Sequence, residues 1–155
     1  MDRTEVRALL DGDLCSIART VELIGDRWSM LLLREAFYGV SRFEQFRENV
    51  HISRAVLTDR LDHLVEHGLL ERVAYQPSGQ RARHEYQLSA AGTDLIPAFA
   101  ALMRWGDEHC NHGIPPITLT HTGCGSPVTS QLLCERGHVV SADAVEPEPG
   151  PGITG

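Results

Sequence analysis

Residues 53–88 have the sequence SRAVLTDRLDHLVEHGLLERVAYQPSGQRARHEYQL, and this stretch decides the fold. Ser53 is a favourable N-cap, and Gly68 is a favourable stop for the helix between them. Three leucines at helical spacing predict one apolar stripe on that helix: Leu57, Leu61 and Leu64. Residues 69–75 and 84–88 have the character of strands and flank a loop that contains proline and glycine. The stretch therefore predicts a capped helix followed directly by a two-stranded hairpin.

Three further helices are expected upstream, over residues 16–24, 27–38 and 42–49. Asp26 can cap the second of them, and Gly39 can end it. Three helices, a capped helix and then a hairpin with a basic tip follow one another in the order of a winged helix-turn-helix. We therefore expect a mainly helical α+β fold with a two-stranded wing, a long C-terminal dimerisation helix and a small ribbon-like C-terminal extension.

The residues after the hairpin predict that long helix and then a loop-rich extension. Ser89 can cap a helix that continues to about His109, and Pro97 is a candidate for a kink in it. Its apolar side is a candidate dimerisation surface made of Leu95, Phe99, Leu102 and Met103. Residues 112–155 hold six of the eight prolines. The expected organisation is a DNA-binding and dimerisation domain over 1–111, a ribbon-like extension over 112–145 and a disordered tail over 146–155.

The composition is that of an ordinary globular protein. Hydrophobic residues make up 42% of the chain and charged residues 23%. The longest apolar run, residues 30–33, is too short to span a bilayer, and the polar start lacks the apolar core of a signal peptide. We therefore expect a cytoplasmic protein with no membrane partner. No glycine-rich phosphate loop, Ser-His-Asp context or pair of acids in an evident pocket marks a catalytic site, so an enzyme is not expected.

The capped helix and the hairpin tip carry the groups that a DNA-binding surface needs. Arginine can donate two hydrogen bonds to guanine, and serine and threonine can contact phosphates or base edges. A flexible tip with cations suits the neighbouring minor groove. The candidate DNA-binding residues are Arg42, Ser53, Arg54, Thr58, Arg60, Gln80, Arg81 and Arg83. The alternative for any single arginine is that it only solvates its own surface.

The net charge of -7 argues against a general binder of nucleic acids. Its distribution weakens that objection, because residues 41–88 hold as many arginines as acids. The chain has no lysine, so phosphate contacts must come from arginine, histidine, hydroxyl or backbone N–H groups. Asp59, Asp62 and Glu66 lie on the exposed side of the capped helix and would repel phosphate. Only the first two turns of that helix are therefore expected to lie deep in a groove.

Several segments resemble HxlR-type regulators. They are CSIARTVELIGDRWSMLLLRE (15–35), RFEQF (42–46), ISRAVLTDRL (52–61), EHGLLER (66–72), HEYQLSAAG (84–92) and WG (105–106). As a set they extend over about residues 14–107. The resemblance implies a homodimeric repressor or activator, with repression as our expectation. It further implies pairing through the first and last helices and contact of residues 53–60 with a pseudo-palindromic operator in double-stranded DNA. The sequence departs from the family at Asp26-Arg27, where Gly-Lys is usual, and in a wing lengthened by residues 78–80.

Cys15 lies just before the first turn of a helix, where the helix dipole favours a thiolate. It aligns with the N-terminal cysteine of HxlR-type proteins, which in some members senses electrophiles or oxidants. The alternative is an inert thiol at a dimer interface. The candidate effector is accordingly an oxidant or a small molecule.

The extension contains two pairs of zinc-type ligands on glycine-rich turns. The candidate metal ligands are His121, Cys124, Cys134 and His138. Spacings of three and four residues within the pairs suit a tetrahedral zinc site, although paired Cys-x2-Cys turns are more usual in similar ribbons. A metal-free extension is the alternative. The rival function for the whole chain is a winged-helix protein-interaction module that no longer binds DNA.

Overall fold

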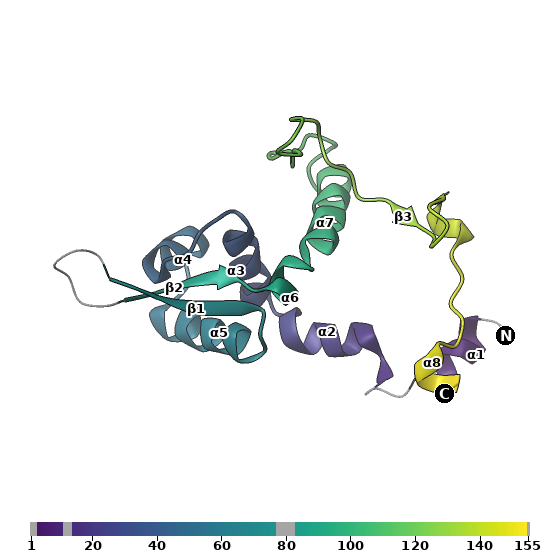
Figure 1. Ribbon diagram of the computed structural model, residues 1–155, viewed down its shortest axis with the longest axis horizontal. Coiled ribbons are helices and arrows are strands. Elements are labelled where there is room, and N and C mark those ends of the chain that lie inside the picture. Colours follow the sequence, from purple (N-terminus) through teal and green to yellow (C-terminus); the bar gives the residue numbers. More distant parts are fainter. Residues whose placement is uncertain (1–2, 11–13, 77–82, 155) are drawn as a thin grey trace. The chain divides into compact units, whose positions relative to one another are not determined.

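The computed structural model describes residues 3–10, 14–76 and 83–154 of the chain (Figure 1). It contains two compact units, Ser16–Ile96 and a second unit that combines the residues up to Cys15 with those from Pro97 onward. The first unit contains α2 (Ser16–Ile24), α3 (Arg27–Phe37), α4 (Phe43–Val50), α5 (Arg54–Glu66), β1 (Leu70–Tyr75), β2 (Arg83–Leu88) and α6 (Ala90–Thr93). Among the described residues, none of the helices is long and apolar enough to cross a membrane.

The first unit is built around leucines from α3, α5 and the first strand, together with a phenylalanine from α4. The side chains that are almost completely buried are Leu32, Leu33, Phe46, Leu57, Leu61, Leu64 and Leu70. The predicted stripe on α5 is thereby confirmed. Removing each such side chain from water contributes about 1.5–3 kcal/mol, so this cluster dominates the stability of the unit. Phe46 meets the ring of Tyr86 edge-on with 6.4 Å between centroids, which joins α4 to β2.

Side-chain caps begin the helices where the sequence predicts them. The Asp26 carboxylate accepts hydrogen bonds from the backbone N–H groups of Trp28 and Ser29, at 2.9 and 3.1 Å. The hydroxyl of Ser53 accepts from the N–H of Val56 at 3.3 Å at the start of α5. Each bond satisfies an N–H group that has no partner within its helix, and these caps are confirmed.

The wing consists of β1 and β2, paired antiparallel from Leu70 opposite Leu88 to Tyr75 opposite Arg83. A third segment, not foreseen from the sequence, joins them. The N–H of Tyr86 donates to the carbonyl of Ser41 at 2.7 Å, and Arg42 forms an isolated bridge with Glu85. The residues just before α4 therefore lie along β2, which places the start of α4 beside the wing.

The predicted long helix is in fact two helices, α6 and then α7 (Ile96–His109). Pro97 explains the break, because it has no N–H group to donate to the carbonyl of Thr93, where α6 ends. Ser89 caps only α6, through a 3.0 Å bond from the N–H of Gly92. A Cβ atom added at Gly92 would lie 2.2 Å from the carbonyl oxygen of Leu69, so glycine is what allows α6 to lie this close to the start of the wing.

The second unit contains α7 and several short elements. They are α1 (Arg3–Ala8), β3 (Leu132–Leu133), β4 (Val139–Val140), a 3-10 turn at Ala142–Ala144 and α8 (Pro151–Thr154). The β3–β4 hairpin and a bridge between Thr120 and Pro127 lie in the region expected to be ribbon-like. Neither α1 nor α8 was expected. Arg3 donates to the carbonyl of Val145 at 2.9 Å, so α1 contacts the last part of the extension.

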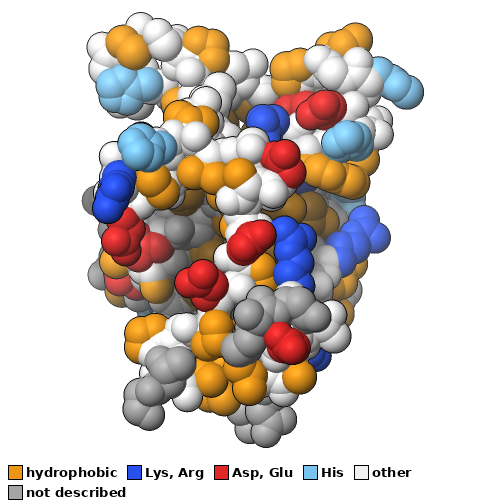
Figure 2. Space-filling model, turned by 90° about the vertical axis from the view of Figure 1, so that its right-hand side faces the viewer, with side chains coloured by type: hydrophobic (Ala, Val, Ile, Leu, Met, Phe, Trp, Pro, Cys, Tyr) orange, Lys and Arg blue, Asp and Glu red, His pale blue; other side chains and the backbone are white. Residues whose placement is uncertain are grey.

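The extension leaves many of its apolar side chains in solvent. Leu132, Leu133 and Val139 are exposed, and the face drawn in Figure 2 shows hydrophobic side chains open to solvent in several places. Met103 of α7 and Val128 of the extension line a small cavity of about 160 Å³. Part of the apolar side of α7 thus faces the extension of the same chain.

Candidate nucleic-acid interface

A hollow of about 710 Å³ opens where the starts of α4 and α5 approach the wing near the loop end of its strands. Its lining residues are Arg42, Phe43, Glu44, Gln45, Arg54, Tyr75, Arg83, His84 and Tyr86. Three of the predicted DNA-binding arginines are therefore brought together around one hollow: Arg42, Arg54 and Arg83. Gln80 and Arg81 lie outside the described residues.

Arg54 is the first residue of α5, the helix predicted to enter the major groove. Its guanidinium carbon lies 5.1 Å from the ring centroid of Phe43. The same guanidinium forms an ion pair with Glu44, yet the Arg54 side chain remains 64% exposed. The guanidinium of Arg54 is thus held by Phe43 and Glu44 while most of the side chain faces solvent.

Arg42 and Arg83 border the hollow from the start of α4 and from the wing. Arg42 stacks its guanidinium over the ring of Tyr75, 5.2 Å from the centroid. A cation over an aromatic face gains electrostatic attraction, which limits the orientations of a long side chain. Arg83 begins β2, and His84 follows it in the lining. Sequence analysis missed His84 and Tyr75, because only the pairing of the wing with the start of α4 brings them to this place.

The two predicted hydroxyl groups lie on the exposed start of α5. Ser53 uses its hydroxyl oxygen to accept from Val56, so its O–H remains a donor for phosphate. Thr58 donates its O–H to the carbonyl of Arg54 at 3.0 Å, so its oxygen remains only an acceptor. Ser53 is therefore suited to a phosphate contact, whereas Thr58 is suited to a base-edge donor or to a thymine methyl group.

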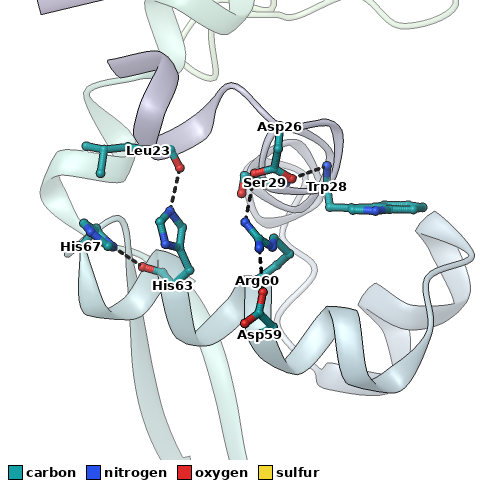
Figure 3. A network of polar contacts seen from close by, with 8 residues as sticks. All are labelled: Leu23, Asp26, Trp28, Ser29, Asp59, Arg60, His63 and His67. Carbon is teal, nitrogen blue, oxygen red and sulfur yellow. Dashed lines mark hydrogen bonds and ion pairs between the residues drawn. The ribbon is translucent and has the colours of Figure 1, made fainter. Parts of the chain in front are cut away.

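The structure does not bring Arg60 to the hollow. Its guanidinium forms ion pairs with Asp26 at 3.5 Å and with Asp59 at 2.7 Å, and it is half-buried (Figure 3). Partial burial raises the pKa of Asp26, but hydrogen bonds from Ser29 and Trp28 and the charge of Arg60 outweigh it. The net effect is a pKa below the ordinary value. Arg60 joins α5 to the start of α3.

His63 connects the same helix to α2, and His67 bonds back to the last turn of α5. The Nε2 atom of His63 lies 2.9 Å from the carbonyl oxygen of Leu23, and Nδ1 of His67 lies 2.9 Å from the carbonyl oxygen of His63 (Figure 3). The two imidazole rings are 4.3 Å apart. Because a carbonyl oxygen can only accept, both imidazoles donate here. One side of α5 is thus fixed to α2 and to the start of α3.

Several large apolar side chains of α2 and of α7 are exposed in the described part of the chain. On α2, Ile17 and Val21 are 73% and 57% exposed, and on α7, Leu102 and Trp105 are 53% and 59% exposed. The sequence also assigned Phe99 and Met103 to the dimerisation surface. Phe99 is buried and Met103 lines the small cavity, so the exposed apolar side of α7 is narrower than predicted.

The cysteines are all free in the described structure. Cys15 is half-buried just before α2, and the other three are exposed. The four predicted zinc ligands lie in two pairs, because Nδ1 of His121 is 3.2 Å from Sγ of Cys124, and the N–H of Cys134 donates to the carbonyl of His138. Among the described residues no three histidine, cysteine or acidic side chains gather closely enough to hold one ion. The sequence spacing brought each pair together but did not bring the pairs to a common site.

Cys124 has an unusual environment for an exposed thiol. Hydrogen bonds from the side chain of Ser126, from His121 and from the backbone of Ser126 stabilise its thiolate and lower its pKa to about 7. Gly125, which follows it, has a φ of +70°, a conformation that glycine adopts without strain. The tight turn keeps Ser126 close to the sulfur.

Comparisons with known proteins agree with this architecture. The family model described as HxlR-like helix-turn-helix matches residues 23–114. An uncharacterized helix-turn-helix transcriptional regulator of Mycobacterium tuberculosis, Rv3095, is 48% identical over 140 residues, which are 89% of this chain and 87% of that protein. An alignment of that length exceeds the first 114 residues, so the relative shares at least part of the extension.

Solved structures show the same fold. The crystal structure of PA1607, described as a candidate transcription factor, matches with a TM-score of 0.73 and 31% identity over 88% of this chain and 95% of that one. The redox regulator HypR in its oxidized form matches with a TM-score of 0.55 and 28% identity over 61% of this chain and 97% of that one. The expected mainly helical α+β fold of the winged helix-turn-helix type is confirmed.

Proposed function

Because the chain belongs to the HxlR-like helix-turn-helix family of transcriptional regulators, which are not enzymes, we propose that it binds a specific operator in double-stranded DNA as a homodimer. The observation that supports DNA binding best is the meeting of Arg42, Arg54 and Arg83 around one hollow between α4, α5 and the wing. The start of α5 and the wing share one basic surface. The helix can therefore contact the major groove while the wing contacts the DNA backbone beside it.

The charges on α5 define how deep the helix can enter the groove. Arg54 is on its first turn, whereas Asp59, Asp62 and Glu66 follow along the exposed side. Asp62 is paired with Arg72 of β1 and Asp59 with Arg60, which offsets the charge of two of these acids. Glu66 at the end of the helix repels phosphate, so we propose that the first two turns of α5 lie in the groove and that its end points away from the DNA.

We propose that a second copy of the chain covers the exposed apolar side chains of α2 and α7. A stable monomer rarely leaves as much apolar surface exposed as the side chains of Ile17, Val21, Leu102 and Trp105 do. Two-fold symmetry would present two copies of α5 to half-sites one or two helical turns apart. In this proposal residues 1–111 carry DNA binding and dimerisation, in keeping with the end of the family match at residue 114.

We further propose that the regulation is repression and that an oxidant relieves it through Cys15. A dimer bound across a promoter excludes polymerase by steric hindrance. Cys15 is half-buried next to α2, so a change at its sulfur would disturb the helix that we place in the dimer. The similarity to HypR, described as a redox regulator, supports an oxidant as the effector. A promoter fusion measured in cells with the wild-type chain and with Cys15→Ser tests both statements.

Selection of bound duplexes from a random-sequence DNA pool tests the central proposal. We expect one motif with two related half-sites, and an affinity whose logarithm falls linearly with the logarithm of salt concentration. Weak binding without a motif at low salt would favour the rival protein-interaction module.

A further inference from the structure

A carboxylate in the middle of a candidate DNA interface calls for an explanation. Glu44 lies in the first turn of α4 and lines the hollow between the helix starts and the wing. A negative charge there repels the phosphate backbone, and nothing in a general phosphate-binding surface requires it. The contacts of Glu44 supply a different reason for its presence.

Both oxygens of Glu44 are engaged by arginines. Oε1 pairs with Nη2 of Arg54 on the next helix, and Oε2 lies 2.8 Å from Nε of Arg47, one turn further along α4. Arg47 attracts the carboxylate by charge alone, because its Nε makes no hydrogen bond with the described residues, whereas the hydrogen bond from Arg54 to Glu44 limits the rotation of Arg54. The group carries a net positive charge, since two guanidinium groups share one carboxylate.

Arg54 is held on two sides by residues of α4. The ring of Phe43 lies under its guanidinium, and Glu44 engages only one of its two Nη atoms. An arginine has five N–H donors, so donors remain for a base edge. A guanidinium that is already oriented loses less conformational freedom on binding than a free one. Its direction relative to α5 is also fixed, which a phosphate contact does not need but a base contact does.

We propose that Glu44 is a positioning residue that holds Arg54 in the orientation in which it donates to the major-groove edge of a guanine. This inference rests on the proposed DNA binding and deepens it by assigning the base preference of one position per half-site to the Glu44–Arg54 pair. Glu44 stays paired with Arg54 in the complex, so it contributes to selectivity rather than to attraction for DNA.

The test uses the full chain and the operator obtained by selection from random duplexes. Affinities are measured for that operator and for duplexes changed at one base pair per half-site, at one salt concentration, and the ratio defines the preference. Arg54→Ala is expected to remove the preference for guanine at one position. Glu44→Ala should lower the preference at the same position by about fivefold or more, the lower end of what a bidentate arginine contact supplies. Adding Glu44→Ala to Arg54→Ala should change the ratio no further.

Two variants separate orientation from charge. Glu44→Gln keeps a side-chain oxygen that accepts from Arg54, so it should retain more of the preference than Glu44→Ala. Glu48→Ala removes the same charge from the same helix at an exposed position that forms no ion pair within the described residues, and it should leave the preference unchanged. Thermal unfolding checks that each variant folds, and if Glu44→Ala does not, Glu44→Gln must still select guanine less sharply than the wild type.

The possible failures are distinguishable. If the wild-type chain selects a motif but Glu44→Ala keeps every base preference, the positioning role is wrong and the proposed function stands. The same conclusion follows if Glu44→Ala raises the affinity for all duplexes equally, because Glu44 would then only repel phosphate. If the wild-type chain selects no motif, the proposed function fails and the inference fails with it.

Discussion

Nε2 of His63 and the carbonyl oxygen of Leu23 are 2.9 Å apart, and this bond joins the last turn of α5 to the last turn of α2. Arg60, one turn earlier on α5, reaches the start of α3 through Asp26. The helix that we place in the DNA groove is therefore fixed to α2, which carries the exposed residues Ile17 and Val21, and to the start of α3. A displacement of α2 in the proposed dimer would be transmitted to α5 through these bonds.

Arg54→Ala and Arg83→Ala should weaken DNA binding in different ways. Loss of Arg54 is expected to cost about 1–3 kcal/mol on the operator and little on random DNA, because a base contact disappears. Loss of Arg83 should weaken binding to the operator and to random DNA alike. It should also reduce the slope of log affinity against log salt by about one, as the loss of a phosphate contact does. Titrations with operator and random duplexes at several salt concentrations check this. An Arg54→Ala variant that binds the operator like the wild type would contradict the groove assignment.

Asp26→Ala should lower the stability of the fold by about 0.5–2 kcal/mol, because two N–H groups of α3 lose their acceptor. Asp26→Asn should lower the stability by less, because the side-chain oxygen of asparagine still caps the helix although the charge is gone. Thermal unfolding measures both, and Asp59→Asn serves as the control because Asp59 pairs with Arg60 but caps no helix.

The lowered pKa of Asp26 predicts that the stability of the fold depends on pH. The pKa of Asp26 is lowered in the folded state, so its stabilising contribution is complete above its ordinary pKa of 3.8. The contribution is lost as the pH falls below that value and through the lower folded-state pKa. The stability difference between the wild type and Asp26→Asn should therefore be largest near neutral pH and shrink toward pH 3. A difference that is independent of pH would show that the charge of Asp26 has no part in the cap.

Ile17→Glu and Leu102→Glu should each convert the dimer to a monomer. A charged side chain in an apolar interface loses its hydration without gaining a partner. Sedimentation at tens of micromolar is expected to show a dimer for the wild type and a monomer for the variants. Val139→Glu, on an exposed apolar residue of the extension, provides the control and should stay dimeric. A wild-type monomer at that concentration would rule out the proposed assembly.

Cys124 should react with iodoacetamide at neutral pH. With a pKa of about 7, half of this thiol is ionised at pH 7, compared with roughly one in a hundred for a thiol at the ordinary value of 9.0. Ser126→Ala and His121→Ala each remove a hydrogen bond to the sulfur and should shift the half-maximal rate to higher pH. Peptide mass spectrometry follows the modification of Cys124. An unchanged pH profile in both variants would contradict the assigned cause.

The helical core could be predicted because its signals are local. A cap at Ser53, leucines at helical spacing and Gly68 lie within one stretch, and each acts on its own helix. The break at Pro97 was only partly predicted, because sequence alone does not show whether a proline bends a helix or divides it. The segment before α4 could not be found as a strand, since a single bridge such as Arg42 with Glu85 leaves no periodic pattern.

The sequence predicted which arginines belong to the candidate interface region, but it did not predict which residues they contact. Arg54 and Arg60 are six residues apart on one helix and look equivalent in the sequence. The first turns out to face the hollow, and the second turns out to face α3. Which way each arginine faces depends on its partner, Glu44 of α4 for Arg54 and Asp26 at the start of α3 for Arg60. The role of Glu44 was missed for the same reason, since it is ten residues from its partner.

The glycine at position 92 has a consequence for comparing related chains. Any side chain there would collide with the carbonyl of Leu69 and force the start of the wing away from α6. A homologous sequence with a larger residue at this position must attach its wing differently, even if its helices are otherwise alike. The identity of that one residue thus indicates whether the wing geometry, and with it the assignment of wing contacts, can be transferred from one member to another.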